Sequence, residues 1–357
     1  MPRPIQALID LSALEQNLSV VRRHAPRARV MAVVKADAYG HGLLRAASAL
    51  KSADGFALLE LDAAIRLRDA GYRQPILLVE GFFSTEELAL IEQYHLSAVI
   101  HHSEQLAMLS AFKRHGGLDV FLKLNTGMNR LGFVPEQFPA ALELLKTSPA
   151  VGQITLMTHF ARADELAGED SVSAQLQRFN AVAAGRNLPC SLANSAAILH
   201  YPETHADWVR PGIMLYGASP FSGKTVAELG LRPVMTISSR IIAVQNLKAG
   251  DAVGYGHTFR ADRPMQVGIV AGGYADGYPR HAPTGTPVLV NGRRSRILGR
   301  VSMDMLHVDL SGIESAGVGS PVILWGEGMP VDEVAQSAGT ISYELLCALA
   351  PRMQVVT

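Results

Sequence analysis

The stretch VMAVVKADAYGHG (residues 30–42) is the part of the sequence from which the fold is best predicted. Its first five residues are apolar and rich in β-branched side chains, which is typical of a buried strand. Gly40 and Gly42 then indicate a turn, and a helical pattern follows over residues 43–50. Lys35 is therefore expected at the carboxyl end of a buried strand, at the mouth of the structure that this strand helps to form.

Two roles suit a lysine at this position. Most lysines at strand ends are solvated, with the aliphatic stem lying on apolar neighbours. A lysine held in a pocket can instead lose its proton and form a Schiff base with a carbonyl compound. Tyr39, four residues on, and the two glycines, which let a ligand approach the backbone, favour the second role for Lys35, although the spacing alone leaves both open.

Strand-like and helical patterns alternate along the first two thirds of the chain. Amphipathic stretches separate eight runs with strand character, at residues 30–34, 56–59, 76–79, 98–101, 120–124, 154–158, 191–193 and 208–216. This alternation predicts a (β/α)8 barrel over residues 8–228. From residue 232 onward short strands follow one another without long helices, so we expect a mostly-β domain over residues 229–357, which residues 1–7 could also join.

The composition excludes several classes of partner. Lys and Arg together number 32, as do Asp and Glu, so the formal net charge is zero and gives no electrostatic reason to bind nucleic acid or an anionic membrane. The first ten residues have no apolar segment of the secretory kind, and no apolar run approaches the length of a membrane span. Cys190 and Cys347 lie far apart in sequence and are expected to be reduced thiols. A cytoplasmic protein is therefore expected.

Polar residues follow several of the predicted barrel strands, where barrel enzymes place their chemistry. Besides Lys35 these are residues 125–132, His159, Asn194, Ser195, Arg210, Gly212 and Ile213. Phosphate groups in such barrels bind at the loops after strands seven and eight, which makes Ser195, Gly212 and Ile213 candidate phosphate ligands. Asn194 and Ser195 are equally suited to capping the next helix, and the two roles are compatible. Arg210 could also form an ordinary ion pair at the rim, and His159 could be an ordinary buried histidine with no role in a site.

The segment around Lys35 resembles the pyridoxal-phosphate lysine motif of bacterial alanine racemases. The strings GGYADGYPR (residues 272–280) and GRVSMDM (residues 299–305) carry the same resemblance, as does Tyr255 between two glycines, although a lone tyrosine in a turn is most often structural. The resemblance covers essentially the whole chain. It implies a homodimer with shared active sites that uses pyridoxal 5′-phosphate to interconvert L-alanine and D-alanine, with no metal.

The resemblance also implies roles for individual residues. Lys35 and Tyr255 of the partner subunit would exchange the substrate proton on opposite faces, since two fixed groups avoid a swinging base. The cofactor would contact Tyr39, His159, Asn194, Ser195, Arg210, Gly212, Ile213 and Tyr343. Arg130 and the backbone of Met303 would bind the substrate carboxylate, and Tyr274 and Asp304 would support or narrow the entrance. Lys123 would orient Arg130 as a carbamate, because two bare cations in one pocket repel each other.

Three other functions remain to be separated from this one. A barrel-fold amino-acid decarboxylase would need to recognise a long cationic side chain, for which the sequence offers no obvious acidic cluster. A non-catalytic pyridoxal-phosphate carrier would not carry the Tyr255 and Met303 strings. A metal-dependent hydrolase would need several His and Asp ligands at the strand ends. For a racemase, the sequence does not distinguish supply of D-alanine for peptidoglycan from breakdown of alanine.

Overall fold

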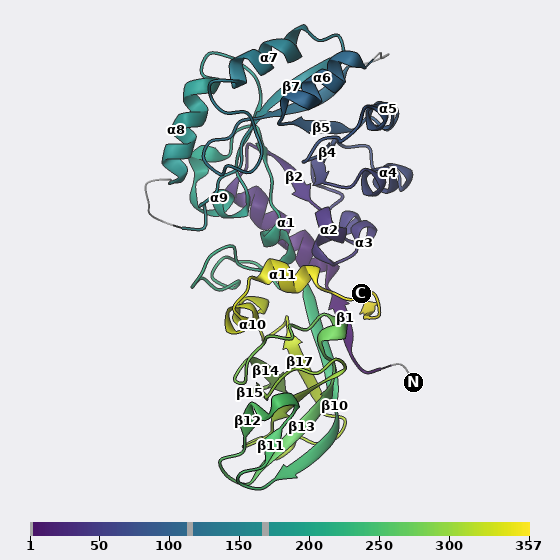
Figure 1. Cartoon of the computed structure of the whole chain (residues 1–357), viewed down its shortest axis with the longest axis vertical. Helices are drawn as coiled ribbons and strands as arrows, with labels where there is room; N and C mark the ends of the chain where they lie inside the picture. Colours follow the sequence, from purple (N-terminus) through teal and green to yellow (C-terminus); the bar gives the residue numbers. More distant parts are fainter. Residues whose placement is uncertain (1–2, 113–116, 166–170) are drawn as a thin grey trace.

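The structure is a computed structural model and describes residues 3–112, 117–165 and 171–357. Eight parallel strands close into a barrel in the order of the sequence, with helices between them (Figure 1). The strands are β2 (Arg29–Val33), β3 (Gly55–Leu58), β4 (Ile76–Leu78), β5 (Ser97–Ile100), β6 (Leu118–Lys123), β7 (Val151–Met157), β8 (Cys190–Ser191) and β9 (Trp208–Val209). The predicted barrel and the mostly-β part that follows it are therefore confirmed.

The helices of the barrel follow its strands. They are α2 (Lys35–Tyr39), α3 (Leu43–Ala49), α4 (Leu61–Asp69), α5 (Thr85–Gln93), α6 (Ser103–Ala111), α7 (Phe138–Thr147), α8 (Val172–Ala183) and α9 (Ser195–His200), with α1 (Leu11–His24) preceding the first barrel strand. Seven of the eight strands contribute one apolar side chain to a separate core cluster: Met31, Ala57, Leu77, Val99, Phe121, Met157 and Trp208. The inside of the barrel is thus a packed core, so chemistry is confined to its rims.

The eighth strand is shorter than the sequence pattern indicates. After β9 the chain turns at Pro211 and Gly212 into the 3-10 helix η2 (Ile213–Tyr216), although residues 208–216 are apolar enough for one strand. Proline has no N–H to donate to a neighbouring strand, which ends the regular pairing. Its carbonyl still accepts the N–H of Val33 at 3.0 Å, so the barrel remains closed next to Lys35.

The second part of the chain is built on one eight-stranded sheet. Its order is β13-β16-β15-β14-β17-β10-β1-β18. The strands are β10 (Met235–Leu247), β13 (Met265–Ala271), β14 (Pro287–Val290), β15 (Arg293–Leu298), β16 (Met305–Asp309), β17 (Pro321–Trp325), β18 (Gln354–Val356) and β1 (Gln6–Ile9). β1 pairs antiparallel with β10 and parallel with β18, so the first strand of the chain completes the sheet made by the last third.

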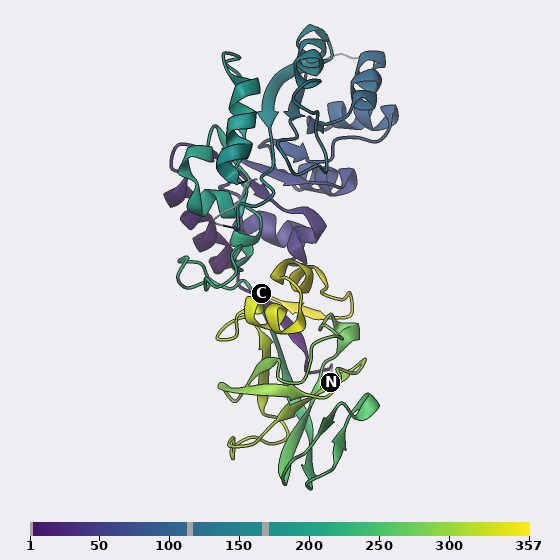
Figure 2. The same ribbon diagram turned by 60° about the vertical axis from the view of Figure 1, so that its left-hand side comes forward.

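Two short helices lie where the sheet and the barrel meet. α10 (Val331–Ala338) and α11 (Ser342–Cys347) occupy this junction in both ribbon views (Figures 1 and 2). An ideal Cβ on Gly40 would lie 2.2 Å from the carbonyl oxygen of Leu346, so the backbone of α11 sits directly on the turn after β2. Only glycine fits there, both for space and for its φ of +78°. Within the described ranges, no helix has the length and apolar character needed to cross a membrane.

Candidate active site

The turn that follows Lys35 is left-handed. Ala36, Asp37, Ala38 and Tyr39 have φ between 51° and 55°, in four consecutive residues that all carry a Cβ. L-residues disfavour this conformation, and it normally occurs singly. The sequence predicted a turn and a helix from residue 43, and the helix is observed, but the reversed hand was not foreseen. Lys35 itself is half-buried at the carboxyl end of β2.

Residues predicted to bind phosphate converge beside this turn. The Oγ of Ser195 accepts the N–H of Gly212 at 2.9 Å and that of Met214 at 3.4 Å, which leaves the hydroxyl proton of Ser195 able to bind an acceptor. A Cβ on Gly212 would lie 2.5 Å from the hydroxyl of Tyr39, so that hydroxyl points into the same corner. The ring centroids of Tyr39 and Tyr343 are 6.1 Å apart. Burial raises the pKa of both tyrosines, which keeps them neutral and able to donate.

Asn194 has the capping role that the sequence allowed for. Its side-chain oxygen accepts the N–H of Ala197 at 3.1 Å at the start of α9, and its amide donates to the carbonyl of Phe160 at 3.3 Å. The capping interpretation is therefore confirmed for Asn194. Ile213 is fully buried at the start of η2 and forms part of the wall next to Gly212.

Arg210 projects across the rim and is almost completely buried. Its guanidinium donates to the hydroxyl of Ser191 at 2.6 Å, the carbonyl of Thr158 at 2.6 Å and the carbonyl of Leu192 at 3.2 Å. These acceptors are all neutral, so its charge is not cancelled by them. Burial lowers the pKa of Arg210 to about 10, and it is still cationic at neutral pH.

Lys123, at the end of β6, lies in the field of the same cations. Burial first, then the charges of Arg210 and Arg130, lower the pKa of Lys123 to about 8. Burial and the charges of Arg210 and Lys123 hold the pKa of His159 well below its usual value, so His159 is neutral. Arg130 is exposed at the end of the turn after β6. The rim therefore combines neutral hydroxyl donors with an excess of positive charge, which suits an anionic ligand.

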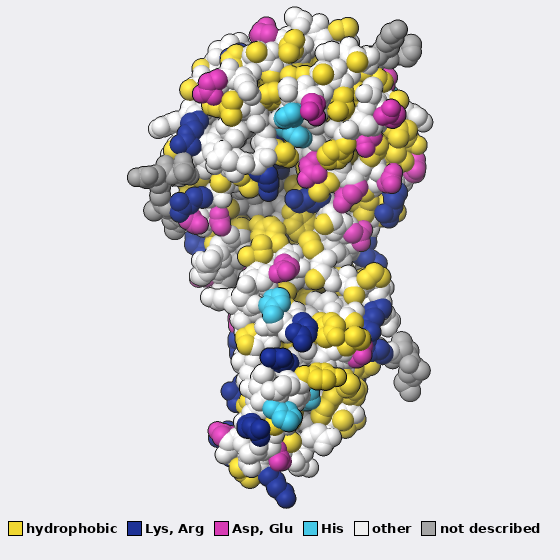
Figure 3. All heavy atoms as spheres, in the orientation of Figure 1, with side chains coloured by type: hydrophobic (Ala, Val, Ile, Leu, Met, Phe, Trp, Pro, Cys, Tyr) yellow, Lys and Arg dark blue, Asp and Glu magenta, His cyan; other side chains and the backbone are white. Residues whose placement is uncertain are grey.

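This rim opens to solvent. Figure 3 shows a hollow between the barrel and the β part, with Lys and Arg side chains gathered at its barrel side and hydrophobic side chains below them.

The remaining predicted site residues lie on the β part. Tyr255 is 71 % exposed in the 3-10 helix η3 (Tyr255–His257), between β11 (Ala252–Val253) and β12 (Phe259–Arg260). Those strands lie at the end of the molecule opposite the barrel (Figure 1). Met303 is 51 % and Tyr274 37 % exposed. Within one chain, Tyr255 is therefore not brought to Lys35.

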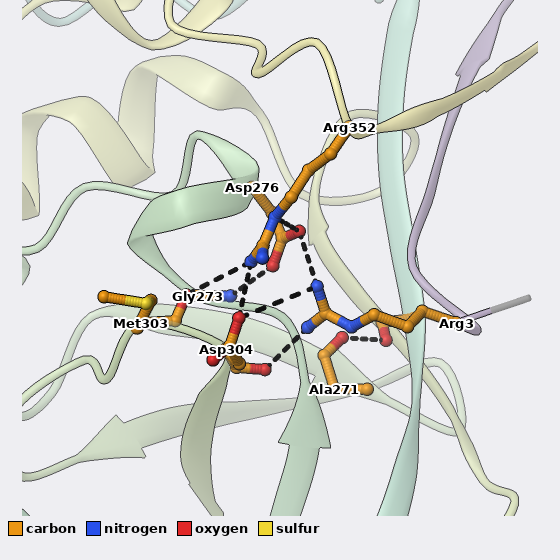
Figure 4. Close-up of polar contacts among 8 residues, drawn as sticks. Arg3, Ala271, Gly273, Asp276, Met303, Asp304 and Arg352 are labelled. Carbon is orange, nitrogen blue, oxygen red and sulfur yellow. Dashed lines mark hydrogen bonds and ion pairs between the residues drawn. The ribbon is translucent and has the colours of Figure 1, made fainter.

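A cluster of charged residues around Asp276 was not predicted from the sequence. The carboxylate of Asp276 is buried and forms ion pairs with Arg3 and Arg352, each at 2.8 Å, and it accepts the N–H of Gly273 at 3.0 Å (Figure 4). Arg352 also pairs with Asp304 at 2.8 Å. Arg3 and Asp276 are separated by 273 positions, so no local pattern links them. The only signal available was an aspartate between glycines in the string at residues 272–280.

This cluster fixes the loop that presents Met303. The guanidinium of Arg3 donates to the carbonyl of Asp304 at 2.8 Å, and that of Arg352 reaches the carbonyl of Met303 at 3.4 Å (Figure 4). The N–H of Ala275 donates to the same Met303 carbonyl at 3.1 Å. The loop therefore has a defined conformation although the Met303 side chain is exposed.

Comparisons with known proteins agree over both parts of the chain. Residues 9–220 match the family model described as alanine racemase, N-terminal domain, and residues 234–357 match alanine racemase, C-terminal domain. The alanine racemase of Nitrosospira multiformis is 74 % identical over 357 residues, with all of both chains covered, and that of Nitrosomonas europaea is 65 % identical, with 100 % of this chain and 99 % of the other covered. The crystal structure of the biosynthetic alanine racemase from Pseudomonas aeruginosa superposes with a TM-score of 0.97 at 46 % identity, covering 99 % of each chain. The resemblance drawn from the sequence is thereby confirmed, and the chain belongs to the alanine racemase family.

Proposed function

We propose that the protein interconverts L-alanine and D-alanine with pyridoxal 5′-phosphate as its cofactor. The observation that carries the proposal is the convergence, on one barrel rim, of an amine at Lys35, a hydroxyl corner and a buried guanidinium at Arg210. Together with family membership, this arrangement provides each group that such a reaction requires from the barrel side.

The residues at the rim fit the cofactor. Gly212 leaves open the space that a Cβ would fill beside the Tyr39 hydroxyl, and the Ser195 hydroxyl has a proton to donate there. Tyr343 adds a second neutral phenol, and Asn194 and Ile213 complete the wall. The bound cofactor would supply an electron-withdrawing ring that acidifies the Cα–H of an attached amino acid. Lys35 would hold it covalently, with His159 and Arg210 at the ring.

The chain's own groups would then move the proton and hold the substrate. Lys35 takes or returns the proton on one face, and Tyr255 of the partner subunit acts on the other, which its exposure on the β part permits. Arg130 and the backbone N–H of Met303 bind the carboxylate, with Asp304 and Tyr274 at the entrance. Because only an uncharged amine reacts with carbon dioxide, the lowered pKa of Lys123 supports its carbamylation.

A mixing experiment tests the shared site. Purified protein is incubated with L-alanine, and D-alanine is measured for the wild type, Lys35→Ala and Tyr255→Phe. Each variant should lose racemisation by orders of magnitude, while only Lys35→Ala loses the covalent cofactor. When the two inactive variants are mixed and allowed to exchange subunits, activity should return at about one site in four, since half of the dimers are mixed and each mixed dimer has one intact site. No recovery in demonstrably exchanged dimers would refute a site shared in this way.

The rival decarboxylase is disfavoured by the charge of the rim. Arg210 is a buried cation there, and its charge would repel the long cationic side chain of such a substrate. Release of carbon dioxide from lysine or ornithine, with no turnover of alanine, would decide for the rival.

A division of the chain near residue 228 and a cytoplasmic location are also part of the proposal. The pairing of β1 within the C-terminal sheet supports counting the first residues with the second domain.

A further inference from the structure

His41 closes the left-handed turn and is completely buried. Its Nδ1 lies 3.0 Å from the carbonyl oxygen of Ala38 and 2.8 Å from that of Tyr39. Because both neighbours can only accept, the proton of the neutral ring belongs on Nδ1. Nε2 then has no hydrogen-bond partner within the described part of the chain. A buried polar atom left in this way is costly, and an apolar residue would fill the same core at lower cost.

Tyr216 contacts the same turn at both ends. Its hydroxyl donates to the carbonyl of Val33 at 2.8 Å, two residues before Lys35. Its ring stacks on Tyr39 with centroids 4.6 Å apart, and it packs against the ring of His41 at 4.7 Å. Burial raises the pKa of Tyr216, so the hydroxyl stays neutral and keeps its proton for Val33.

These contacts act on a backbone that would not hold its shape alone. Left-handed geometry at Ala36, Asp37 and Ala38 is disfavoured for each residue, and the preferred alternative is an ordinary right-handed turn. A right-handed turn would carry Tyr39 away from the corner at Gly212 and change the direction of the chain after Lys35. Contacts from outside the turn must therefore stabilise the left-handed conformation.

We propose that His41 and Tyr216 are positioning residues that lock the left-handed turn, so that the Lys35 amine and the Tyr39 hydroxyl face the cofactor site together. His41 holds the carbonyls at the end of the turn, and Tyr216 holds the strand before it and the ring of Tyr39. Neither residue needs to touch substrate or cofactor. The consequence for catalysis rests on the proposed function, whereas the consequence for the turn does not.

The first test measures the turn itself in the protein freed of cofactor. His41→Phe keeps a ring and removes both hydrogen bonds, and His41→Asn keeps a donor near the position of Nδ1. We expect amide hydrogen exchange over residues 36–42 to accelerate about tenfold in His41→Phe, the factor for the net loss of about one hydrogen bond, and far less in His41→Asn. The rate at which Lys35 is acetylated, measured by mass spectrometry, should also change more in His41→Phe than in His41→Asn. Exchange and acetylation unchanged in His41→Phe would overturn the proposal.

The second test separates positioning from simple stability. Tyr216→Phe removes the bond to Val33, and Tyr278→Phe is its matched control, because the Tyr278 hydroxyl is buried without a partner in the described ranges. In the holoenzyme Tyr216→Phe should lower kcat about tenfold with KM within about threefold. Tyr278→Phe should leave both constants unchanged. Equal effects of the two variants, or a loss that follows only the melting temperature, would refute a positioning role. If the wild type does not racemise alanine but exchange over residues 36–42 still responds, the proposed function fails and the locking of the turn stands.

Discussion

Replacement of Gly212 by alanine should weaken cofactor binding through Tyr39. An ideal Cβ at Gly212 lies 2.5 Å from the Tyr39 hydroxyl oxygen and 3.3 Å from its Cζ. An ordinary contact between these atoms needs about 3.4 Å or more, so the hydroxyl must move by about 1 Å. The stacked ring of Tyr216, 4.6 Å away, resists that movement. The displaced phenol would no longer reach an anionic ligand in the corner.

The size of the effect follows from the bond that is lost. A hydrogen bond to a charged group contributes about 1.5–3 kcal/mol, so the Kd for pyridoxal phosphate should rise by about 10-fold to 100-fold. The added methyl should also lower the free energy of unfolding by about 1–3 kcal/mol through overpacking. The Kd is measured by titrating the cofactor into protein freed of it, and stability by urea unfolding.

A double variant identifies the cause. In Tyr39→Phe the hydroxyl that clashes is absent, so adding Gly212→Ala should weaken cofactor binding little further, and the two changes should be strongly non-additive. Additive losses would mean that Gly212 acts through something other than Tyr39. Unchanged cofactor affinity in Gly212→Ala alone would refute the argument that these residues form the phosphate corner.

Three further predictions concern charge. Asp276→Asn removes a carboxylate that Arg3 and Arg352 share, and it should lower the free energy of unfolding by about 2 kcal/mol, the cost of a lost hydrogen bond to a charged group. The KM for alanine should rise because the Met303 loop loosens. Unchanged urea unfolding would contradict this prediction. Burial lowers the pKa of His41 from its usual 6.5 to about 4, so the unfolded chain takes up a proton before the folded chain as the pH falls. The free energy of unfolding should therefore drop by about 3 kcal/mol between pH 6.5 and pH 4. The drop should be smaller in His41→Asn, which has no imidazole to titrate. Lys123, with its pKa near 8, should take up ¹³C-labelled carbon dioxide increasingly from pH 7 to pH 9, giving a carbamate signal in NMR that Lys123→Ala lacks.

The sequence predicted the barrel because its signal is local. Each barrel strand is a short apolar run, and the inner core cluster shows the reason, since Met31, Phe121 and Trp208 point into the barrel while neighbouring side chains face the helices. The convergence of Ser195 and Gly212 was also predictable, because barrels place phosphate sites after strands seven and eight. Pro211 indicates that the last barrel strand ends early, but the apolar run at residues 208–216 led to the prediction of one longer strand.

The left-handed turn was not predictable from residues 36–39 themselves. Alanine and aspartate have no strong preference for positive φ, and their spacing resembles an ordinary helix start. The conformation is imposed from outside, by His41, by Tyr216 from η2 and by α11 on Gly40. The Asp276 cluster escaped prediction for the same reason, because its partners come from opposite ends of the chain. In both places tertiary contacts override the local preference.

Through α11, the junction between the barrel and the β part contacts residues of the candidate site. The Leu346 carbonyl lies where a Cβ of residue 40 would be, and one helical turn earlier Tyr343 reaches the ring of Tyr39. The junction thus fixes the same tyrosine that Gly212 and Tyr216 position from the barrel. A shift of α11 would therefore move Tyr343 and disturb Tyr39 together, so we expect the β part to influence the proposed cofactor site of its own chain in addition to the role proposed for Tyr255 in the partner's site.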